Sequence, residues 1–398
     1  MDRPSTARSI GALVALSVST FIYVTTETLP IGLLPLIADD LSTSPSAVGL
    51  LVTGYGLMVV FASVPLTRLT YRMPRRLVLT SLLAVFIAAN ALSAAATTYG
   101  VLLGARVVIA LSQALFWAIV VSTATGLFPP RVHGRVVAVV FAGNSIAAVL
   151  GVPAGTWLGQ QAGWRASFLA LGAVGLLALV AIASLLPAAP AGADPVTKGT
   201  APDARAYWRL MAMATLAVTG AFTGFTYVAP FLTDVSDFPA AAIGPLLLVR
   251  GIASLLGVAV GGHLADRDAR AAMVVPVAAQ SVALLGLYVL GDVPIVAAGL
   301  VALTGLAFSA MCTAAASRIL QVAPGSVELA SAGVSTAFNV GITAGAFIGS
   351  VLLPGFGVRS TALVGGVLSL AALALTITPL YASGRAGGRR RSWDGGRA

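Results

Sequence analysis

The chain has 398 residues, of which 58% are hydrophobic and only 9% charged, and its mean hydropathy is +0.97. A soluble domain carries about a quarter charged residues, so this composition excludes a water-soluble monomer. The apolar stretches lack the alternation of a membrane β-barrel, and the length suits about twelve helices of about 20 residues. We therefore predict an all-α membrane protein with twelve transmembrane helices.

A formal net charge of +10 would suggest nucleic-acid binding in a soluble protein. In a membrane protein the same excess follows from the positive-inside rule, so we expect no nucleic-acid partner. His133 and His263 lie far apart and predict no metal site, and Cys312 is the single cysteine. The only lysine, Lys198, lacks the glycines of a P-loop, so ATP is not expected to drive the protein.

The apolar stretches predict helices that are joined by short loops. In chain order, the expected ranges are 10–37, 46–67, 77–96, 99–126, 135–159, 164–186, 209–233, 240–262, 271–290, 294–319, 328–352 and 358–381. The organisation that follows is an N-terminal six-helix bundle over 1–186, a flexible Pro/Ala/Gly/Asp-rich cytoplasmic linker over 187–208, a C-terminal six-helix bundle over 209–382 and a basic cytoplasmic tail over 383–398.

Basic residues in the loops fall almost entirely on one side of these helices. That side takes Arg3, Arg8, Arg68, Arg72, Arg75, Arg76, Arg131, Arg135, Lys198, Arg205, Arg209, Arg267, Arg270, Arg318, Arg385, Arg389, Arg390, Arg391 and Arg397. The other side holds only Arg165 and Arg359, with Asp39, Asp40, Asp234, Asp237 and Asp292. This asymmetry predicts a multi-pass protein of the inner (plasma) membrane with both termini in the cytoplasm.

The two halves resemble each other weakly at an offset near 194 residues. The segment from Asn144 to Arg165 is echoed by the segment from Asn339 to Arg359; both are Gly-rich and end in Gly-x-Arg. The basic loop that ends at Arg76 is matched by one that ends at Arg270. Parallel repeats of this kind are typical of two-halved secondary transporters with a site between the halves.

Few ionisable residues lie inside the apolar stretches, and each is a functional candidate by default. These are Glu27, Arg106 and Arg250, each roughly 8 to 11 residues, or about 12–16 Å, from the outer end of its helix. Desolvation favours a neutral carboxyl and a nearby arginine favours the ionised one, which is the balance that proton coupling needs. The alternative is a permanent ion pair of Glu27 with Arg106 or with Arg250. For Arg250 two roles stay open: it binds an anionic or hydroxylated substrate, or it faces a water-filled gap.

Softer candidates for a substrate cavity are polar and aromatic. One group is Tyr23, Tyr55, Gln113, Trp117, Phe225, Tyr227 and Phe308; for each of these, packing or anchoring at the membrane interface is the alternative. The other group is Asn144 and Asn339, for which the alternative is bridging between helices.

The fifth apolar stretch carries Gly151, Gly155 and Gly159 at intervals of four, with Gly143 before them and Pro153 among them. Glycine disfavours a helix in water but lets a neighbouring helix approach closely in a bilayer. The stripe therefore predicts close packing, which is either static or a sliding interface.

Four stretches together resemble one family. They are TTETLPIGLL at 25–34, AR at 105–106 with QALFW at 113–117, GVPAG at 151–155 followed by GQQAGWR at 159–165, and GHLADR at 262–267. The chain resembles the major facilitator superfamily over nearly its whole length, and within it the bacterial drug and sugar efflux (drug:proton antiporter, twelve-helix) arm.

The resemblance implies two pseudo-symmetric six-helix bundles around a central cavity. It makes the glycine stripe an antiporter motif, which favours the sliding interface, and gives Arg106 a part in proton transfer with Glu27. It also implies gating loops at Arg72 and Arg76 and at Asp266, Arg267 and Arg270. The first loop, LTYRMPRR at 69–76, departs from the family pattern because it has no acidic residue.

We expect a monomeric proton-coupled antiporter that exports a drug-like or sugar-like small molecule by alternating access, with the proton gradient in place of a cofactor. The alternatives are a proton-coupled importer and, in a different class, a membrane-embedded enzyme or a receptor. An enzyme would need a convergent nucleophile, base or metal cluster, and the sequence offers none.

Overall fold

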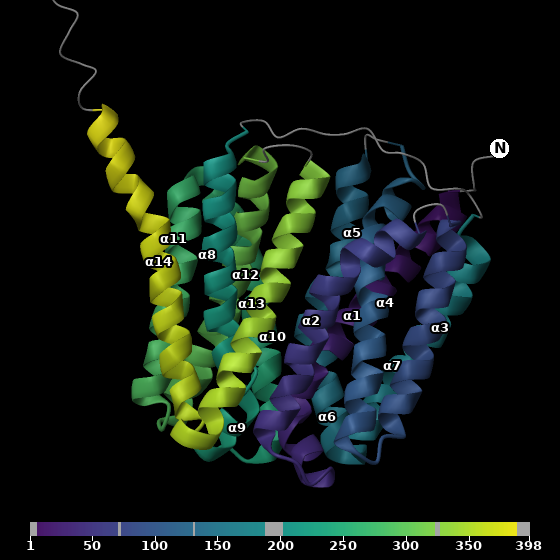
Figure 1. The fold of residues 1–398 in the computed structure, drawn as a ribbon, viewed down its shortest axis with the longest axis horizontal. Helices are drawn as coiled ribbons and strands as arrows, with labels where there is room; N and C mark the ends of the chain where they lie inside the picture. The colour runs from purple at the N-terminus through teal and green to yellow at the C-terminus, as the bar shows by residue number, and fades with distance from the viewer. Residues whose placement is uncertain (1–5, 71–72, 130–131, 188–201, 323–326, 388–398) are drawn as a thin grey trace, which may run out of the picture.

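The computed structural model describes residues 6–70, 73–129, 132–187, 202–322 and 327–387. Figure 1 shows an upright array of long helices. The elements are α1 (Thr6–Asp40), α2 (Pro45–Thr70), α3 (Arg75–Ala94), α4 (Tyr99–Thr125), α5 (His133–Ile146), a π-helical turn η2 (Ala147–Gly151), α6 (Val152–Ala162), α7 (Trp164–Leu185), α8 (Ala204–Phe225), α9 (Val228–Asp234), a 3₁₀ turn η3 (Ala240–Ala242), α10 (Ile243–Arg267), α11 (Ala269–Leu290), α12 (Pro294–Val322), α13 (Val327–Phe356) and α14 (Arg359–Gly387).

Within the described residues, eleven helices are long and apolar enough to cross a membrane, and α8 with α9 makes a twelfth if this bent pair is one span. The sequence predicted a continuous helix here, whereas α8 and α9 meet at an angle of 42°. Pro230 has no N–H with which to bond the carbonyl of Thr226, so the helical bonding is interrupted where the bend occurs. The all-α membrane fold is thus as predicted, with one broken span.

The fifth predicted helix is also irregular. It runs as α5, η2 and α6, and the π-helical turn ends two residues before Pro153. A proline at this place removes one helical hydrogen bond, and a π turn is a common way to absorb such a change. The irregular turn lies on the helix that carries the glycine stripe.

The helices form two groups, α1–α7 (the N-terminal half) and α8–α14 (the C-terminal half), each with its own cluster of buried apolar side chains. The only two glycines with positive φ in the described chain, Gly163 at 83° and Gly357 at 73°, form tight turns 194 residues apart. Two residues after each turn an arginine binds the end of another helix. Arg165 donates to the carbonyl of Ala96 at 2.8 Å, and Arg359 to that of Tyr288 at 2.7 Å. The internal repeat read from the sequence therefore has a structural counterpart.

The limits of the halves differ slightly from the predicted ones. Helix α8 begins at Ala204, five residues before position 209, because Asp203 caps it with bonds to the amides of Arg205 and Ala206 at 2.9 and 3.0 Å. Helix α14 continues to Gly387, past the boundary at 382. Most of the predicted linker and the end of the tail lie outside the described residues.

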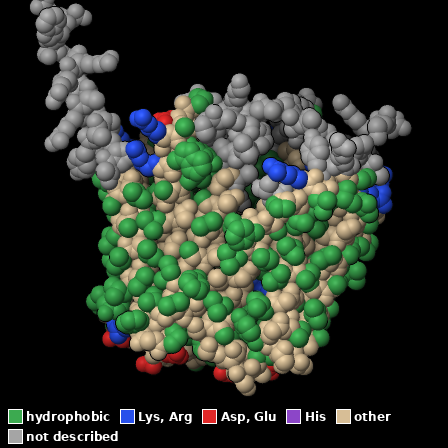
Figure 2. Space-filling view, in the orientation of Figure 1, with side chains coloured by type: hydrophobic (Ala, Val, Ile, Leu, Met, Phe, Trp, Pro, Cys, Tyr) green, Lys and Arg blue, Asp and Glu red, His purple; other side chains and the backbone are tan. Residues whose placement is uncertain are grey.

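Charged side chains gather at the two ends of the helices, and an apolar band lies between them (Figure 2). The end that carries Arg68, Arg75, Arg76, Arg209, Arg267, Arg270 and Arg318 is called the basic end, and the end that carries Asp39, Asp40, Asp234, Asp237 and Asp292 the acidic end. Large apolar side chains such as Leu177 (71% exposed) and Ile295 (83% exposed) face outward in the band. Such a surface suits contact with lipid.

The halves meet mainly where α2 packs on α13, where α10 packs on η2 and α6, and where α1 packs on α9. At the acidic end, Ser46 donates a hydrogen bond to the carbonyl of Ser350, and Gln160 donates to that of Ala240 at 2.6 Å. Tyr227 is fully buried there, with Gly49 of the other half against its hydroxyl group. These contacts join the halves firmly at the acidic end.

Candidate functional site

The site begins with a proline in α1. Pro30 has no N–H, so the carbonyl of Thr26, four residues earlier, has no partner within the helix. Arg106 of α4 fills this place: its side chain is fully buried, and one guanidinium nitrogen donates to the carbonyl of Thr26. The other donates to the carbonyl of Glu27 at 2.9 Å. The arginine is thus held by the main chain of α1 rather than by a side-chain carboxylate.

The carboxyl group of Glu27 is bonded by an amide. Nε2 of Gln113 donates to Oε2 of Glu27 at 2.7 Å, and the hydroxyl of Tyr55 donates to Oε1 of Gln113 at 2.6 Å. The tyrosine fixes which way the amide points, so the NH₂ group faces the carboxyl group. The guanidinium of Arg106 lies over the Tyr55 ring, 4.4 Å from its centre. Three helices, α1, α2 and α4, therefore converge on one carboxyl group.

Glu27 has no ion pair in the described part of the chain. The two ion pairs found there, Arg165 with Asp40 at 2.6 Å and Arg359 with Asp292 at 3.3 Å, both lie at the acidic end. The permanent pairing of Glu27 with Arg106 or Arg250, considered from the sequence, is not what the structure shows. Because no ion pair has to break, the half-buried carboxyl group can gain or lose a proton while Gln113 continues to hold it.

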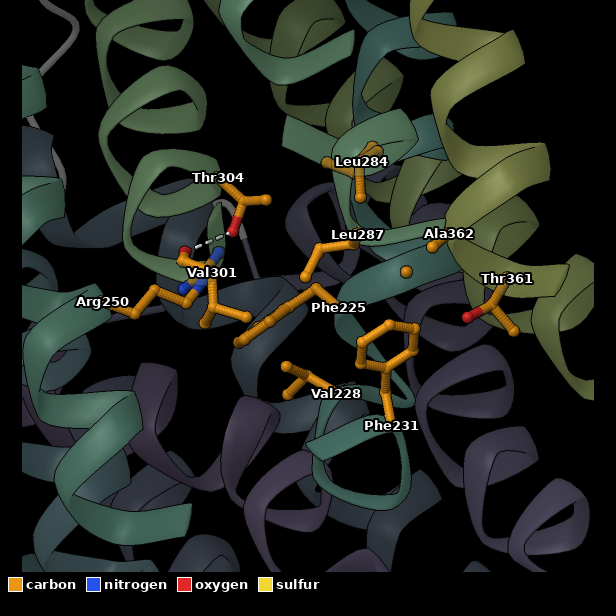
Figure 3. A pocket seen from close by; sticks show the side chains of 12 residues that line it. Phe225, Val228, Phe231, Arg250, Leu284, Leu287, Val301, Thr304, Thr361 and Ala362 are labelled. Atoms are coloured by element: carbon orange, nitrogen blue, oxygen red, sulfur yellow. Dashed lines mark hydrogen bonds between the residues drawn. The ribbon is translucent and has the colours of Figure 1, made fainter. Parts of the chain in front are cut away.

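Arg250 lies in the other half and joins no cluster with Glu27. Its guanidinium stacks on Phe225 of α8, 3.7 Å from the ring centre. It lines a cavity inside the C-terminal half, together with side chains such as Val301, Thr304 and Leu287 (Figure 3). The matched depth of the three charges along their helices therefore did not place them in one site.

Tyr23, Trp117 and Tyr227 are aromatic candidates that have packing or hydrogen-bond partners. Tyr23 is fully buried in the N-terminal half, stacks on Phe116 at 4.6 Å and donates to the carbonyl of Leu82 at 3.2 Å. Trp117 is half-buried, and its ring lies 5.8 Å from that of Phe141. Tyr227 donates to the carbonyl of Ala346 at 3.1 Å. Tyr23 thus belongs to a core rather than to a cavity.

The two asparagines, equivalent in sequence, have different surroundings. Asn144 is exposed on α5, whereas Asn339 is half-buried on α13. The main-chain oxygen of Asn339 lies 3.5 Å from where a Cβ on Gly56 would be, so this residue belongs to the contact between the halves.

The glycine stripe packs against α1 of its own half, not against the other half. A Cβ added at Gly155 would lie 2.6 Å from Leu29, and Gly151 and Gly159 meet Thr25 and Leu33 at the same offset of 126 residues. Gly143 follows this register and faces the main chain of α1. The partner of the stripe is therefore α1 of the same bundle, and sliding at this contact stays a prediction.

One of the glycines that meet the opposite half is Gly251 on α10. A Cβ at Gly251 would lie 2.5 Å from the carbonyl oxygen of Ala148 and 2.7 Å from Cα of Val149, both in η2. Pro153 shares this contact region, since its carbonyl lies 3.6 Å from the same position on Gly244. The irregular turn of the fifth span is thus a place where the halves touch backbone to backbone.

The predicted gating loops lie at the basic end. Arg76, Arg267 and Arg270 are placed there by the ends of α2, α3, α10 and α11. Arg72 and the side chain of Asp266 lie outside what the structure describes. A closed gate between these residues stays a prediction.

The features that the sequence did not point to are main-chain ones. The free carbonyl of Thr26 was signalled only by Pro30 four residues later, and the role of Gly251 by nothing but its being a glycine in a membrane helix. A half-buried carboxyl group with no ion pair among the described residues, on one helix of a two-halved bundle, is typical of a membrane carrier.

Comparison with known proteins agrees with this class. The model of the Major Facilitator Superfamily matches residues 16–326 and 211–394. The uncharacterized MFS-type transporter YtbD of Bacillus subtilis (strain 168) is 35% identical over 383 residues, which cover 92% of this chain and 95% of YtbD.

Solved structures share the fold. A bacterial homologue of the human lysosomal transporter Spinster, in an inward-facing and unoccupied conformation, superposes with a TM-score of 0.74 at 17% identity, over 94% of this chain and 97% of that one. The human organic anion transporter MFSD10 superposes with a TM-score of 0.66 at 15% identity, over 94% of this chain and 100% of that one. The chain belongs to the major facilitator superfamily. It is a secondary transporter with a small-molecule substrate, and not an enzyme.

Proposed function

We propose that this transporter is a proton-coupled antiporter that exports a small drug-like or sugar-like molecule. The observation that carries the proposal is Glu27: a carboxyl group within a membrane span, bonded by Gln113 at 2.7 Å and in none of the ion pairs of the described residues. A carboxyl group of this kind changes its charge at little structural cost. The resemblance of residues 25–34 and 151–165 to the drug and sugar efflux arm supports the direction of transport.

The chemistry of coupling follows from the hydrogen bonds. The amide of Gln113 can donate to the ionised carboxylate and equally to the carbonyl oxygen of the protonated acid. Substrate binding near Glu27 would favour one form, and departure of the substrate would favour the other. Arg106 binds the carbonyls of Thr26 and Glu27, and so anchors α1 beside α4, where Gln113 reaches the carboxyl group.

The halves would rock about the contacts that join them, among them α2 with α13 and α10 with η2. The backbone approach at Gly251 permits a close seam, and the π turn beside Pro153 offers a place where the helix can bend. With the basic end in the cytoplasm, as the charge pattern favours, both termini are cytoplasmic and the joined acidic end faces outward. A single chain in the plasma membrane is then the transport unit.

The proposal is tested with purified protein in proteoliposomes that carry an imposed pH gradient. Ethidium and chloramphenicol serve as drug-like probes, and arabinose and lactose as sugar probes. We expect the gradient to drive one of these classes against its own concentration gradient, and to do so from the face that the basic end occupies. Movement that ignores the pH gradient, or that runs in the same direction as the protons, would replace the antiporter by a uniporter or an importer.

A further inference from the structure

A hollow of about 310 Å³ opens at the basic end of the C-terminal half. Its walls come from α8, α11, α12 and α14, close to the ends of these helices. The volume lies within the range of about 300–1,000 Å³ that is usual for ligand sites, so an organic group fits. The hollow is separate from the cavity beside Arg250, with which it shares no lining residue.

Three arginines from three helices line this hollow: Arg209 of α8, Arg270 of α11 and Arg318 of α12. None of the described residues that line it is acidic. The carboxylates of Asp203 and Asp268 lie at the starts of α8 and α11, where each accepts bonds from the first main-chain amides of its helix. Neither Arg209 nor Arg270 belongs to the ion pairs found in the described chain. These two exposed arginines can therefore bind an anion.

The inner wall of the hollow is apolar. Leu210 and Met213 of α8 and Met273 of α11 line it and are 7%, 2% and 8% exposed. Leu375 of α14 lines it too, but its side chain is 39% exposed, as in the outward-facing apolar band. The hollow thus places positive charge beside an apolar surface, which suits a ligand with a charged head and a hydrocarbon body.

Trp208 indicates the depth of the hollow in the membrane. It precedes Arg209 on α8, is 69% exposed, and its ring lies 5.5 Å from that of Tyr207. Exposed tryptophans in membrane proteins are enriched at the level of the lipid head groups. The arginine beside it therefore lies where the phosphates of a leaflet are found.

We propose that this hollow binds an anionic phospholipid of the leaflet at the basic end. Its phosphate is bound by Arg209 and Arg270, because a guanidinium matches two phosphate oxygens with two parallel N–H groups. One acyl chain packs on the apolar wall. Basic pockets between membrane helices suit such head groups, and a lipid bound here joins the ends of α8 and α11.

Native mass spectrometry of the purified protein in detergent tests this site, because it counts the lipid molecules that stay bound. The probes are dioleoyl phosphatidylglycerol and dioleoyl phosphatidylcholine, which have the same acyl chains and differ in net charge. We expect the wild type to prefer phosphatidylglycerol at least about 10-fold, and only this lipid to raise its midpoint of thermal unfolding. Arg209→Gln and Arg270→Gln should each lower the preference about 5-fold, and the double variant should abolish it.

The matched control is the double variant Arg68→Gln with Arg135→Gln. It removes two exposed arginines from the N-terminal half, and neither of them lines the hollow. The control should keep the wild-type preference, and thermal unfolding in phosphatidylcholine shows that every variant is folded. Equal losses in the two double variants would mean that lipid follows the overall charge of the protein, and the proposal would be overturned. A wild type that binds both lipids equally would overturn it as well.

Glycerol 3-phosphate distinguishes a lipid from a water-soluble phosphate ester. It has a phosphate on glycerol but no acyl chains, so it should displace phosphatidylglycerol at least about 100-fold less effectively than a second lipid molecule does. Displacement at equal concentration would assign the hollow to a soluble phosphate ester and exclude the lipid. The measurement involves no transport, so its outcome is independent of proton coupling at Glu27.

Discussion

Gln113 donates a 2.7 Å hydrogen bond to the carboxyl group of Glu27, and the hydroxyl of Tyr55 fixes the direction of that amide at 2.6 Å. The bond joins α4 to α1 without a formal charge on the donor. A neutral donor can serve the carboxyl group in both protonation states, whereas an arginine in its place would favour only the ionised state. The pair is therefore suited to a cycle in which a proton arrives and leaves.

Removing this donor should uncouple transport from the proton. Gln113→Ala leaves Glu27 without its hydrogen bond, and bonds to charged groups contribute about 1.5–3 kcal/mol. We expect gradient-driven flux in proteoliposomes to fall roughly 10-fold or more. The neighbouring variant Ser112→Ala is the control, because that hydroxyl donates to the carbonyl of Ile109 in its own helix, at 2.8 Å, and its other partner is Tyr23 rather than Glu27. Equal losses in both variants would mean that the effect is one of packing in α4.

A double-mutant cycle tests the link between Pro30 and Arg106. In the wild type, Arg106→Gln removes the donors to the carbonyl of Thr26, and a buried unsatisfied carbonyl costs about 1–3 kcal/mol. In the Pro30→Ala background a main-chain N–H becomes available to that carbonyl. Thermal unfolding in detergent should therefore show a smaller loss of stability from Arg106→Gln in this background. Additive losses would show that the arginine does not act through the carbonyl that the proline leaves free.

The Gln113–Glu27 bond and the link between Pro30 and Arg106 show how much of the site could be predicted from the sequence. Glu27, Arg106, Tyr55 and Gln113 could all be singled out because polar groups in a membrane span are rare, and all four belong to one network. Their connections could not be predicted, because the rotamer of an arginine does not follow from its depth in a helix. The one available signal was a proline four residues after Thr26, which predicts an unpaired carbonyl but not the group that pairs with it.

Most helices were predictable as well, since their apolar runs end at charged or turn-forming residues; the fourth was expected at 99–126 and is Tyr99–Thr125. The break in the seventh helix could not be predicted, because the sequence stays hydrophobic throughout the bend before Pro230. The helix against which the glycine stripe packs could not be predicted from the sequence either. A spacing of four shows that a smooth face exists, but not which neighbour lies on it.

Close approach between the halves depends on Gly251, whose added Cβ would meet the backbone of η2 at 2.5 Å. Backbone atoms cannot move aside as a side chain can, so Gly251→Ala should hold the halves apart at this contact. We expect transport to fall at least about 10-fold while the protein stays folded and monodisperse. Gly262→Ala in the same helix is the control, since nothing lies within 4 Å of its added Cβ. Normal turnover by Gly251→Ala would show that this contact need not close during the cycle.

The central claim is that the carboxyl group of Glu27 itself gains and loses the coupling proton. Infrared difference spectra of the reconstituted protein, recorded between low and high pH, report protonated carboxyl groups directly and need no substrate. The account predicts a carbonyl-stretching band of a protonated acid that disappears on raising the pH and is missing in Glu27→Gln, while the loop aspartates give the same bands in both proteins. An identical set of titrating bands in the wild type and in Glu27→Gln would contradict it.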